Sequence, residues 1–378
     1  MQARADLKTA SLFPNPQLVA ATTLQPLATH LSPQSPGGPP QYSLDLAAPL
    51  DPILFGKRSA AIESARRAVD VAGADLADFS RQQRAQVAAA FFDVLEARAL
   101  LTLVREDLQG LRDVEALTRR RAEIGGAPTI DVDRARLAVV LAAQDLRTAE
   151  TAHQGTIAHL RALLGRSSPE PAFDVDGSLD VPTPSEPPDL ESALAGAADA
   201  RPDLVSLRRQ ALRWQAEARL QRRQGLPTLG ASLGYIYQRQ QPVGGPNVNL
   251  WEATVAMSVP VFDRNQGNVA RAESLARQAL AALEAGRANL RGELAQAWAA
   301  FRAAHDAVVA DDRNQLQAAQ SVKERTEAAY KAGGRTLLEL LDAERAYRDA
   351  RRLHVRIQSA YWHALHAVNA AAGVPVLD

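Results

Sequence analysis

Apolar residues recur four and seven positions apart along most of the chain, as Leu283, Leu290 and Leu294 do. This spacing places them on one stripe of an α-helix. Two segments with the pattern, residues 57–122 and 268–331, contain no proline. At 1.5 Å per residue each would form a helix with a length on the order of 90 Å. A helix of that length without an internal stop signal is typical of coiled coils and helical repeats.

A pair of glycines follows each long segment, and a shorter segment with helical spacing comes next. The pairs are Gly125–Gly126 and Gly333–Gly334, and the shorter segments cover residues 131–164 and 338–372. Because glycine adopts positive φ without strain, it suits a tight turn between helices. The pattern therefore predicts two antiparallel helical hairpins, over residues 57–164 and 268–372.

Apolar and polar residues alternate with period two ahead of each hairpin, which is the pattern of β-strands. The predicted strands cover residues 14–24, 42–50, 227–238 and 250–261. The alternation is clearest where Leu233, Tyr235 and Tyr237 share one face. An ordinary sheet with one buried face gives the same alternation. Strands of about ten residues with Tyr and Trp near their ends also have membrane-spanning length.

The two halves of the chain repeat this order of strand, strand and helical hairpin. The turn at Gly125 matches the turn at Gly333, an offset of 208 residues. We predict a first repeat over residues 1–166, a Pro- and Ser-rich linker over 167–188 and a second repeat over 189–378. The second repeat opens with an extra helix at 189–224. The first has no room for a counterpart, so we expect its N-terminal helix to be truncated in this chain.

Composition narrows the function classes. The chain has 43 basic and 43 acidic residues and a net charge of zero, so no global field attracts nucleic acid. Cysteine is absent, and no stretch of about 18 apolar residues predicts a transmembrane helix. Four strands are too few for an outer-membrane barrel, which needs about eight, and open edges are not tolerated in lipid. If the strands enter a membrane, three chains would supply twelve of them.

The sequence gives little indication of enzymatic activity. It has no nucleotide-binding loop, nucleophile elbow or zinc-protease helix. His363 and His366 are three apart and could ligate a metal, but no carboxylate lies at an adjacent turn position, so we expect an ordinary helix surface and no metal site. We expect the run Arg119–Arg121 to be a solvated helix face. Neither catalytic residues nor a cofactor are predicted.

Three segments carry a family resemblance: residues 201–204 (RPDL), 259–268 (VPVFDRNQGN) and 330–343 (YKAGGRTLLELLDA). The sequence resembles the TolC family of outer-membrane efflux ducts, and its 259–268 segment resembles the CzcC-like heavy-metal efflux branch. The resemblance implies a mainly α fold with a small β part. It also implies a homotrimer whose twelve strands form a barrel in outer-membrane lipid, continued by a helical tunnel across the periplasm.

The resemblance further implies a passive channel in a tripartite system. Its partners would be a periplasmic adaptor (membrane fusion protein) and an inner-membrane pump of the RND type. An acidic pair, Glu339 and Asp342, would form the periplasmic gate. Tyr330, Arg335 and Asp131 would lock it, and the tip glycines Gly125, Gly126, Gly333 and Gly334 would contact the adaptor. Three copies of each acid in a ring would favour cations. Without the resemblance, the preferred interpretation of the pair is a solvated first helical turn favoured by the helix dipole.

Two alternatives stay open. Within the duct interpretation, the exported substrate is heavy-metal cations or else drugs and organic solutes. Outside it, a periplasmic coiled-coil scaffold or adaptor protein would explain the hairpins. It would not explain two matched pairs of strands between prolines, and the compact β-domain of an adaptor is not evident in the sequence.

Overall fold

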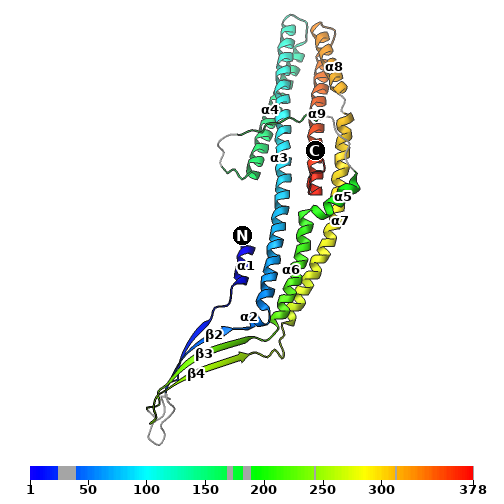
Figure 1. Cartoon of the computed structure of the whole chain (residues 1–378). Helices are drawn as coiled ribbons and strands as arrows, with labels where there is room; N and C mark the ends of the chain where they lie inside the picture. Colours follow the sequence, from blue (N-terminus) through cyan, green and yellow to red (C-terminus); the bar gives the residue numbers. More distant parts are fainter. Residues whose placement is uncertain (24–39, 168–172, 182–188, 242–243, 311–312, 378) are drawn as a thin grey trace. The chain divides into compact units, whose positions relative to one another are not determined.

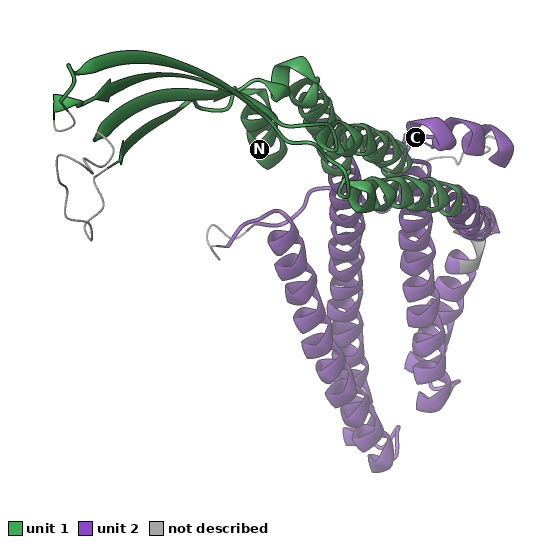
Figure 2. Ribbon diagram, turned by 90° about the horizontal axis from the view of Figure 1, so that it is seen from below, with its two compact units in different colours: residues 1–76, 203–286 green, residues 77–202, 287–378 purple. Residues whose placement is uncertain are grey.

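The computed structural model of the chain describes residues 1–23, 40–167, 173–181, 189–241, 244–310 and 313–377, the last range without the side chains of 313–315. The chain forms two compact units, residues 1–76 with 203–286 and residues 77–202 with 287–378 (Figure 2). Each unit takes segments from both sequence repeats. The two compact units therefore do not coincide with the two sequence repeats.

The first unit combines a sheet with helix segments that leave it (Figure 1). Its elements are α1 (Gln2–Ser11), β1 (Gln17–Thr23), β2 (Gln41–Pro49), α2 (Asp51–Leu54), the start of α3 (Lys57–Glu123), α6 (Pro202–Gln224), β3 (Leu229–Gln238), β4 (Val248–Met257) and the start of α7 (Gln266–Ala310). The last predicted strand, 250–261, is wrong at both ends, because β4 begins at Val248 and ends at Met257. Beyond it, Pro260 has no N–H to offer a neighbouring strand.

The four strands form one antiparallel sheet in the order β1-β2-β3-β4. The central pair joins the two repeats, with Leu46 of β2 opposite Leu233 of β3. Their neighbours on the same face include Trp251 and Val255 of β4, which are 77% and 71% exposed. A face of large apolar side chains stands open to the surroundings, and within the chain no described residue covers it.

The opposite face of the sheet is polar. Asp45 and Glu252 are both cross-strand partners of Gly234. A side chain at Gly234 would collide with the carboxylate of Asp45, so the glycine provides the space in which this carboxylate lies. Thr254 donates to Glu252 at 3.1 Å on the same face.

A buried ion pair ties the sheet to the helices of the first unit. The Lys57 ammonium lies 2.8 Å from the Asp51 carboxylate and donates to the Pro227 carbonyl oxygen at 2.9 Å. Both side chains are nearly buried, at 12% and 11% exposure. Removing one partner of such a pair leaves an uncompensated charge, which is strongly destabilising.

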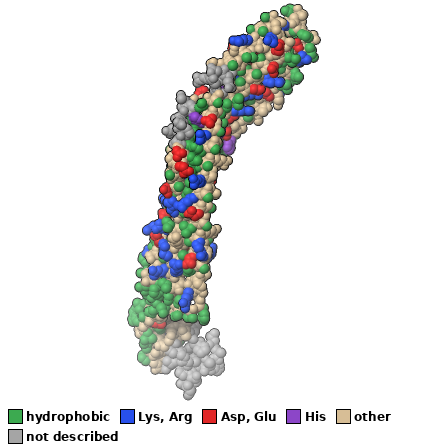
Figure 3. All heavy atoms as spheres, turned by 90° about the vertical axis from the view of Figure 1, so that its right-hand side faces the viewer, with side chains coloured by type: hydrophobic (Ala, Val, Ile, Leu, Met, Phe, Trp, Pro, Cys, Tyr) green, Lys and Arg blue, Asp and Glu red, His purple; other side chains and the backbone are tan. Residues whose placement is uncertain are grey.

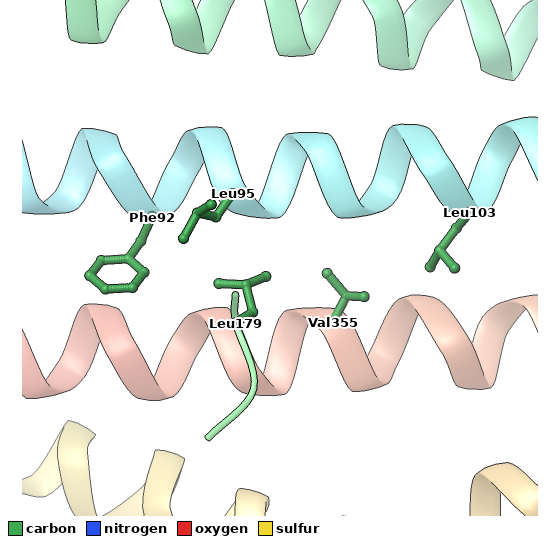
Figure 4. Close-up of a cluster of buried hydrophobic side chains, with 5 residues drawn as sticks. All are labelled: Phe92, Leu95, Leu103, Leu179 and Val355. Atoms are coloured by element: carbon green, nitrogen blue, oxygen red, sulfur yellow. The ribbon is translucent and has the colours of Figure 1, made fainter. Parts of the chain in front are cut away.

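The second unit is helical. It contains the rest of α3 and α7 together with α4 (Thr129–Leu163), α5 (Leu190–Ala200), α8 (Arg313–Lys331) and α9 (Leu337–Ala372). Buried apolar side chains join α3 to α9, among them Phe92, Leu95, Leu103 and Val355 (Figure 4). Across the described ranges, none of the helices is apolar enough over a sufficient length to cross a membrane.

The predicted helix 189–224 is wrong as a single helix, because the structure has two. The first ends at Ala200, and Arg201 adopts an extended conformation with ψ of 120°. Pro202 explains the break, since proline disfavours the helical conformation in the residue before it. The Arg201 side chain is almost buried and pairs with Glu293 at 2.7 Å.

Part of the predicted linker packs into the second unit. Of residues 167–188, the structure describes 167 and 173–181. In that stretch Leu179 inserts between α3 and α9 (Figure 4), and its carbonyl accepts from the Trp362 indole at 3.0 Å. The Arg98 guanidinium donates to the carbonyl of Gly177 at 2.7 Å. This stretch is therefore fixed by side chains of both helices.

Candidate functional site

Both helical hairpins turn through the same backbone geometry. Gly125 and Gly333 have φ of +75° and +80°. The N–H of Gly126 donates to the carbonyl of Arg121 at 2.7 Å, and the N–H of Gly334 donates to that of Ala329 at 2.8 Å. These are Schellman turns, in which the left-handed residue costs glycine little. The positive φ explains why glycine is needed in both turns. Contact of these glycines with a partner protein stays a prediction.

Arg121 joins the two tips. Its guanidinium donates to the backbone carbonyl of Tyr330, lies 4.4 Å from the centre of the Tyr330 ring, and donates to the Gly126 carbonyl at 3.0 Å. The expectation of a solvated face is wrong for this residue, which is half-buried. The sequence signal that could have found it is its place in the last turn of α3, where a cation satisfies free carbonyl groups.

Tyr330 is the most buried aromatic side chain at the tips, at 2% exposure. Its hydroxyl lies 2.9 Å from Oγ1 of the fully buried Thr118. Around it pack Val114, Ala135, Leu337 and Leu340 from α3, α4 and α9. Both hairpins are thus fastened to each other by an apolar cluster with one hydrogen bond inside it.

Glu339 belongs to the capping box that starts α9. Its carboxylate accepts from the Thr336 N–H at 2.8 Å, while the Thr336 hydroxyl accepts from the Glu339 N–H at 3.3 Å. The Thr336 N–H, followed by the Arg335 guanidinium 2.5 Å away, holds the pKa of Glu339 below its ordinary value. Glu339 therefore carries its negative charge at neutral pH.

Asp342 lies one turn further along α9 and is exposed. Residues three apart on a helix share a face, so Glu339 and Asp342 together present two carboxylates on one side of α9. Both positions of the predicted gate therefore lie together.

The predicted lock residues are not brought together within one chain. Tyr330 bonds Thr118, Arg335 pairs with Glu339, and Asp131 pairs with Arg134 on its own helix at 3.3 Å. A bond between two copies of the chain stays a prediction. Sequence reasoning missed Thr118, whose role depends on the pairing of two hairpins far apart in sequence.

Charged groups also link the helices farther from the tips. Lys323 of α8 pairs with the buried Glu344 of α9 at 3.2 Å. Asp107 of α3 lies 3.9 Å from Arg352 of α9, and its Oδ2 has no hydrogen-bond partner among the described residues. Burial raises the pKa of Asp107, and the positive charge of Arg348 partly offsets this increase.

The two histidines of α9 pack into the unit. His363 lies 3.2 Å from Asp93, and His366 lies against the rings of Phe92 and Trp362. Burial, and next the neighbouring His363, lower the pKa of His366. They differ from an ordinary helix surface because both contact residues of α3 and are half-buried. In the described part of the chain, no three His, Cys, Asp or Glu residues are grouped to hold a metal.

A small antiparallel sheet continued by two long helical hairpins is the protomer architecture of outer-membrane efflux channels. The chain matches the family model for outer membrane efflux proteins over residues 1–166 and 194–374. It is 30% identical over 322 residues to the cobalt-zinc-cadmium resistance protein CzcC of Cupriavidus metallidurans, covering 85% of this chain and 74% of that protein. To protein CyaE of Bordetella pertussis it is 28% identical, covering 84% and 68%.

Solved structures agree in fold. A CusC crystal structure superposes with a TM-score of 0.78 at 21% identity, covering 99% of this chain and 86% of that one. The outer membrane protein VceC of Vibrio cholerae gives 0.73 at 20% identity, covering 100% and 93%. The chain belongs to the outer membrane efflux protein family. The predicted resemblance and the mainly α fold class are confirmed, and so is the location in the outer membrane with a periplasmic helical part.

Proposed function

We propose that three copies of this chain form a passive duct, and that none of its residues performs catalysis. The observation that carries the proposal is the open apolar face of the sheet, whose exposed side chains include Leu233, Trp251 and Val255. Four strands leave two open edges, which lipid does not tolerate. Three sheets joined edge to edge pair every strand, place the apolar face toward lipid, and enclose the polar face.

We place the gate of this duct at Glu339 and Asp342. Three copies of each carboxylate around a narrow mouth would concentrate negative potential and favour cations. The position of Glu339 and Asp342 on one face of α9 supports this role. Tyr330, Arg335 and Asp131 remain the proposed lock of the closed state, with any bond between Arg335 and Asp131 made across two copies.

The tips are the proposed contact with a periplasmic adaptor, which would connect the duct to an inner-membrane pump of the RND type. The two Schellman turns, with Gly125, Gly126, Gly333 and Gly334, support this because both present the same backbone groups. Heavy-metal cations are the proposed cargo, since the relative CzcC is named for cobalt, zinc and cadmium resistance. The alternative cargo is drugs or organic solutes.

Single-channel conductance in a planar bilayer tests the proposal. The wild type should give stable, cation-preferring openings, and the double variant Glu339→Ala with Asp342→Ala should lose much of that preference. A matched control is Glu324→Ala, an exposed acid of α8. No conductance from a folded protein would reject the duct and favour a periplasmic scaffold. Equal loss of preference in the control would reject the gate.

A further inference from the structure

The junction between sheet and helices in the first unit carries exposed apolar side chains. Phe262, just after β4, is 91% exposed. Leu12 and Phe13 lie before β1, and Ile53 and Leu54 lie after β2, all four about 60% exposed. These five residues, called the junction collar below, come from three separate connections. All five side chains are mostly exposed in the folded chain.

Specific contacts hold the collar in place. Asn265 adopts φ of +62° and its amide donates to the Gln221 carbonyl at 2.8 Å, which fixes the loop of Phe262 against the end of α6. At Gly225 an added side chain would collide with the backbone of Arg264. The collar loop and the helix end therefore form one rigid piece.

The other connections are fixed by arginines. The Arg58 guanidinium lies 4.1 Å from the centre of the Phe13 ring and donates to the Ser11 carbonyl. Arg223 donates to the Phe55 carbonyl at 3.3 Å. Cationic groups thus stand beside the exposed apolar side chains at each connection.

The helices next to the collar are strongly basic. Residues 213–226 and 262–277 contain seven arginines and three acidic residues, in a chain whose net charge is zero. Arg219 and Arg264 are exposed, and no ion pair is formed by either guanidinium with any described residue. Figure 3 shows hydrophobic side chains gathered over the sheet and many Lys and Arg side chains over the helical part that adjoins it.

We propose that the junction collar and its arginines bind anionic phospholipid headgroups of the inner leaflet of the outer membrane. The inference rests on the proposed function, which directs the sheet's apolar face toward lipid. Apolar side chains beside cationic ones match the boundary between acyl chains and phosphates. The collar residues lie next to one end of β1, β2 and β4, so the lipids that surround the sheet place their headgroups at these arginines.

Native mass spectrometry of the purified full chain in mixed micelles tests the proposal, with phosphatidylglycerol and phosphatidylethanolamine as probes. The wild type should bind phosphatidylglycerol in preference, and high salt should remove the preference because it screens exposed charges. Arg219→Gln with Arg264→Gln should weaken phosphatidylglycerol binding by roughly fivefold for each arginine. Phe262→Ser should weaken binding of both lipids.

The matched control is Arg302→Gln, an exposed arginine of α7 in the second unit. An equal loss of phosphatidylglycerol in this control, or no preference in the wild type, would overturn the proposal. Displacement of the lipid by inorganic phosphate at equal concentration would show a site for soluble anions and reject it as well. Conductance distinguishes a failure of the collar proposal from a failure of the duct: a conducting protein without lipid preference refutes lipid binding by the collar alone, whereas a non-conducting protein refutes the duct.

Discussion

The hydroxyl of Tyr330 donates a hydrogen bond to Oγ1 of Thr118. The direction follows from Thr118, whose single proton is given to the Val114 carbonyl at 2.8 Å, so its oxygen can only accept from Tyr330 at 2.9 Å. This bond connects the C-terminal end of α3 in the first repeat to that of α8 in the second. It lies in an apolar cluster, where water cannot replace a lost partner.

Tyr330→Phe should lower the free energy of unfolding by about 1 kcal/mol, the usual net value of one hydrogen bond. If the bond also favours the closed gate, channel openings should become longer. Thermal unfolding and single-channel recording measure the two effects. In a double-mutant cycle with Thr118→Val, the second change should cost less when Tyr330 is already Phe. Strict additivity would contradict the bond.

Arg121→Gln should loosen the joined tips, because three interactions with Tyr330 and Gly126 are lost together. Hydrogen bonds from a charged group are worth about 1.5 to 3 kcal/mol. Hydrogen exchange at the amides of residues 330–334 should accelerate. The neighbouring Arg120 is exposed, and Arg120→Gln provides the control. Equal acceleration in both variants would refute the specific role of Arg121.

Glu339→Gln should reduce stability at neutral pH and not at low pH. The pKa of Glu339 is lowered in the folded chain, so its ionised form contributes stability above the ordinary value of 4.5. That contribution is lost as the pH falls from 4.5 through the lower folded value. Melting temperatures of both proteins between pH 3 and pH 7, read at roughly one-unit steps, should converge at the acidic end. A constant difference would contradict the shift.

Asp107→Asn should behave in the opposite way. Burial raises the pKa of Asp107, so the ionised group costs stability above its folded value, and folding becomes more favourable as the pH falls toward 3.8. The variant should be as stable as the wild type or more so at neutral pH, and the two should converge in acid. A large loss at neutral pH would show that attraction by Arg348 and Arg352 outweighs burial.

The sequence predicted the order of elements well, because periodicity is a local property. Both hairpins and both tip turns follow from apolar spacing and paired glycines. The break at Arg201 could have been predicted from Pro202, because proline disfavours the helical conformation in the residue before it. Thr118 lies beyond such local reasoning, because its partner Tyr330 comes from the other repeat and the pairing of two hairpins leaves no local signal.

The prediction of the site was limited in the same way, because contacts between segments far apart in sequence leave no local signal. Glu339 and Asp342 could be placed on one helix face from their spacing alone. The capping contacts of Glu339 could also have been inferred, since Thr336 and Glu339 form the T-x-x-E pattern. The lock residues Tyr330, Arg335 and Asp131 were assigned by resemblance, and within one chain each of them has a different partner.

The pairing of Leu46 with Leu233 has a consequence for how the chain folds. Strand β2 is completed early in synthesis, but its partner β3 follows only after the whole first helical hairpin and α6. Contacts between such distant segments form slowly, and unpaired strand edges with exposed apolar side chains are prone to aggregate. The strands of the first repeat must therefore be shielded while the chain crosses the periplasm. A periplasmic holding chaperone is expected to bind the β1–β2 segment more strongly than the helices.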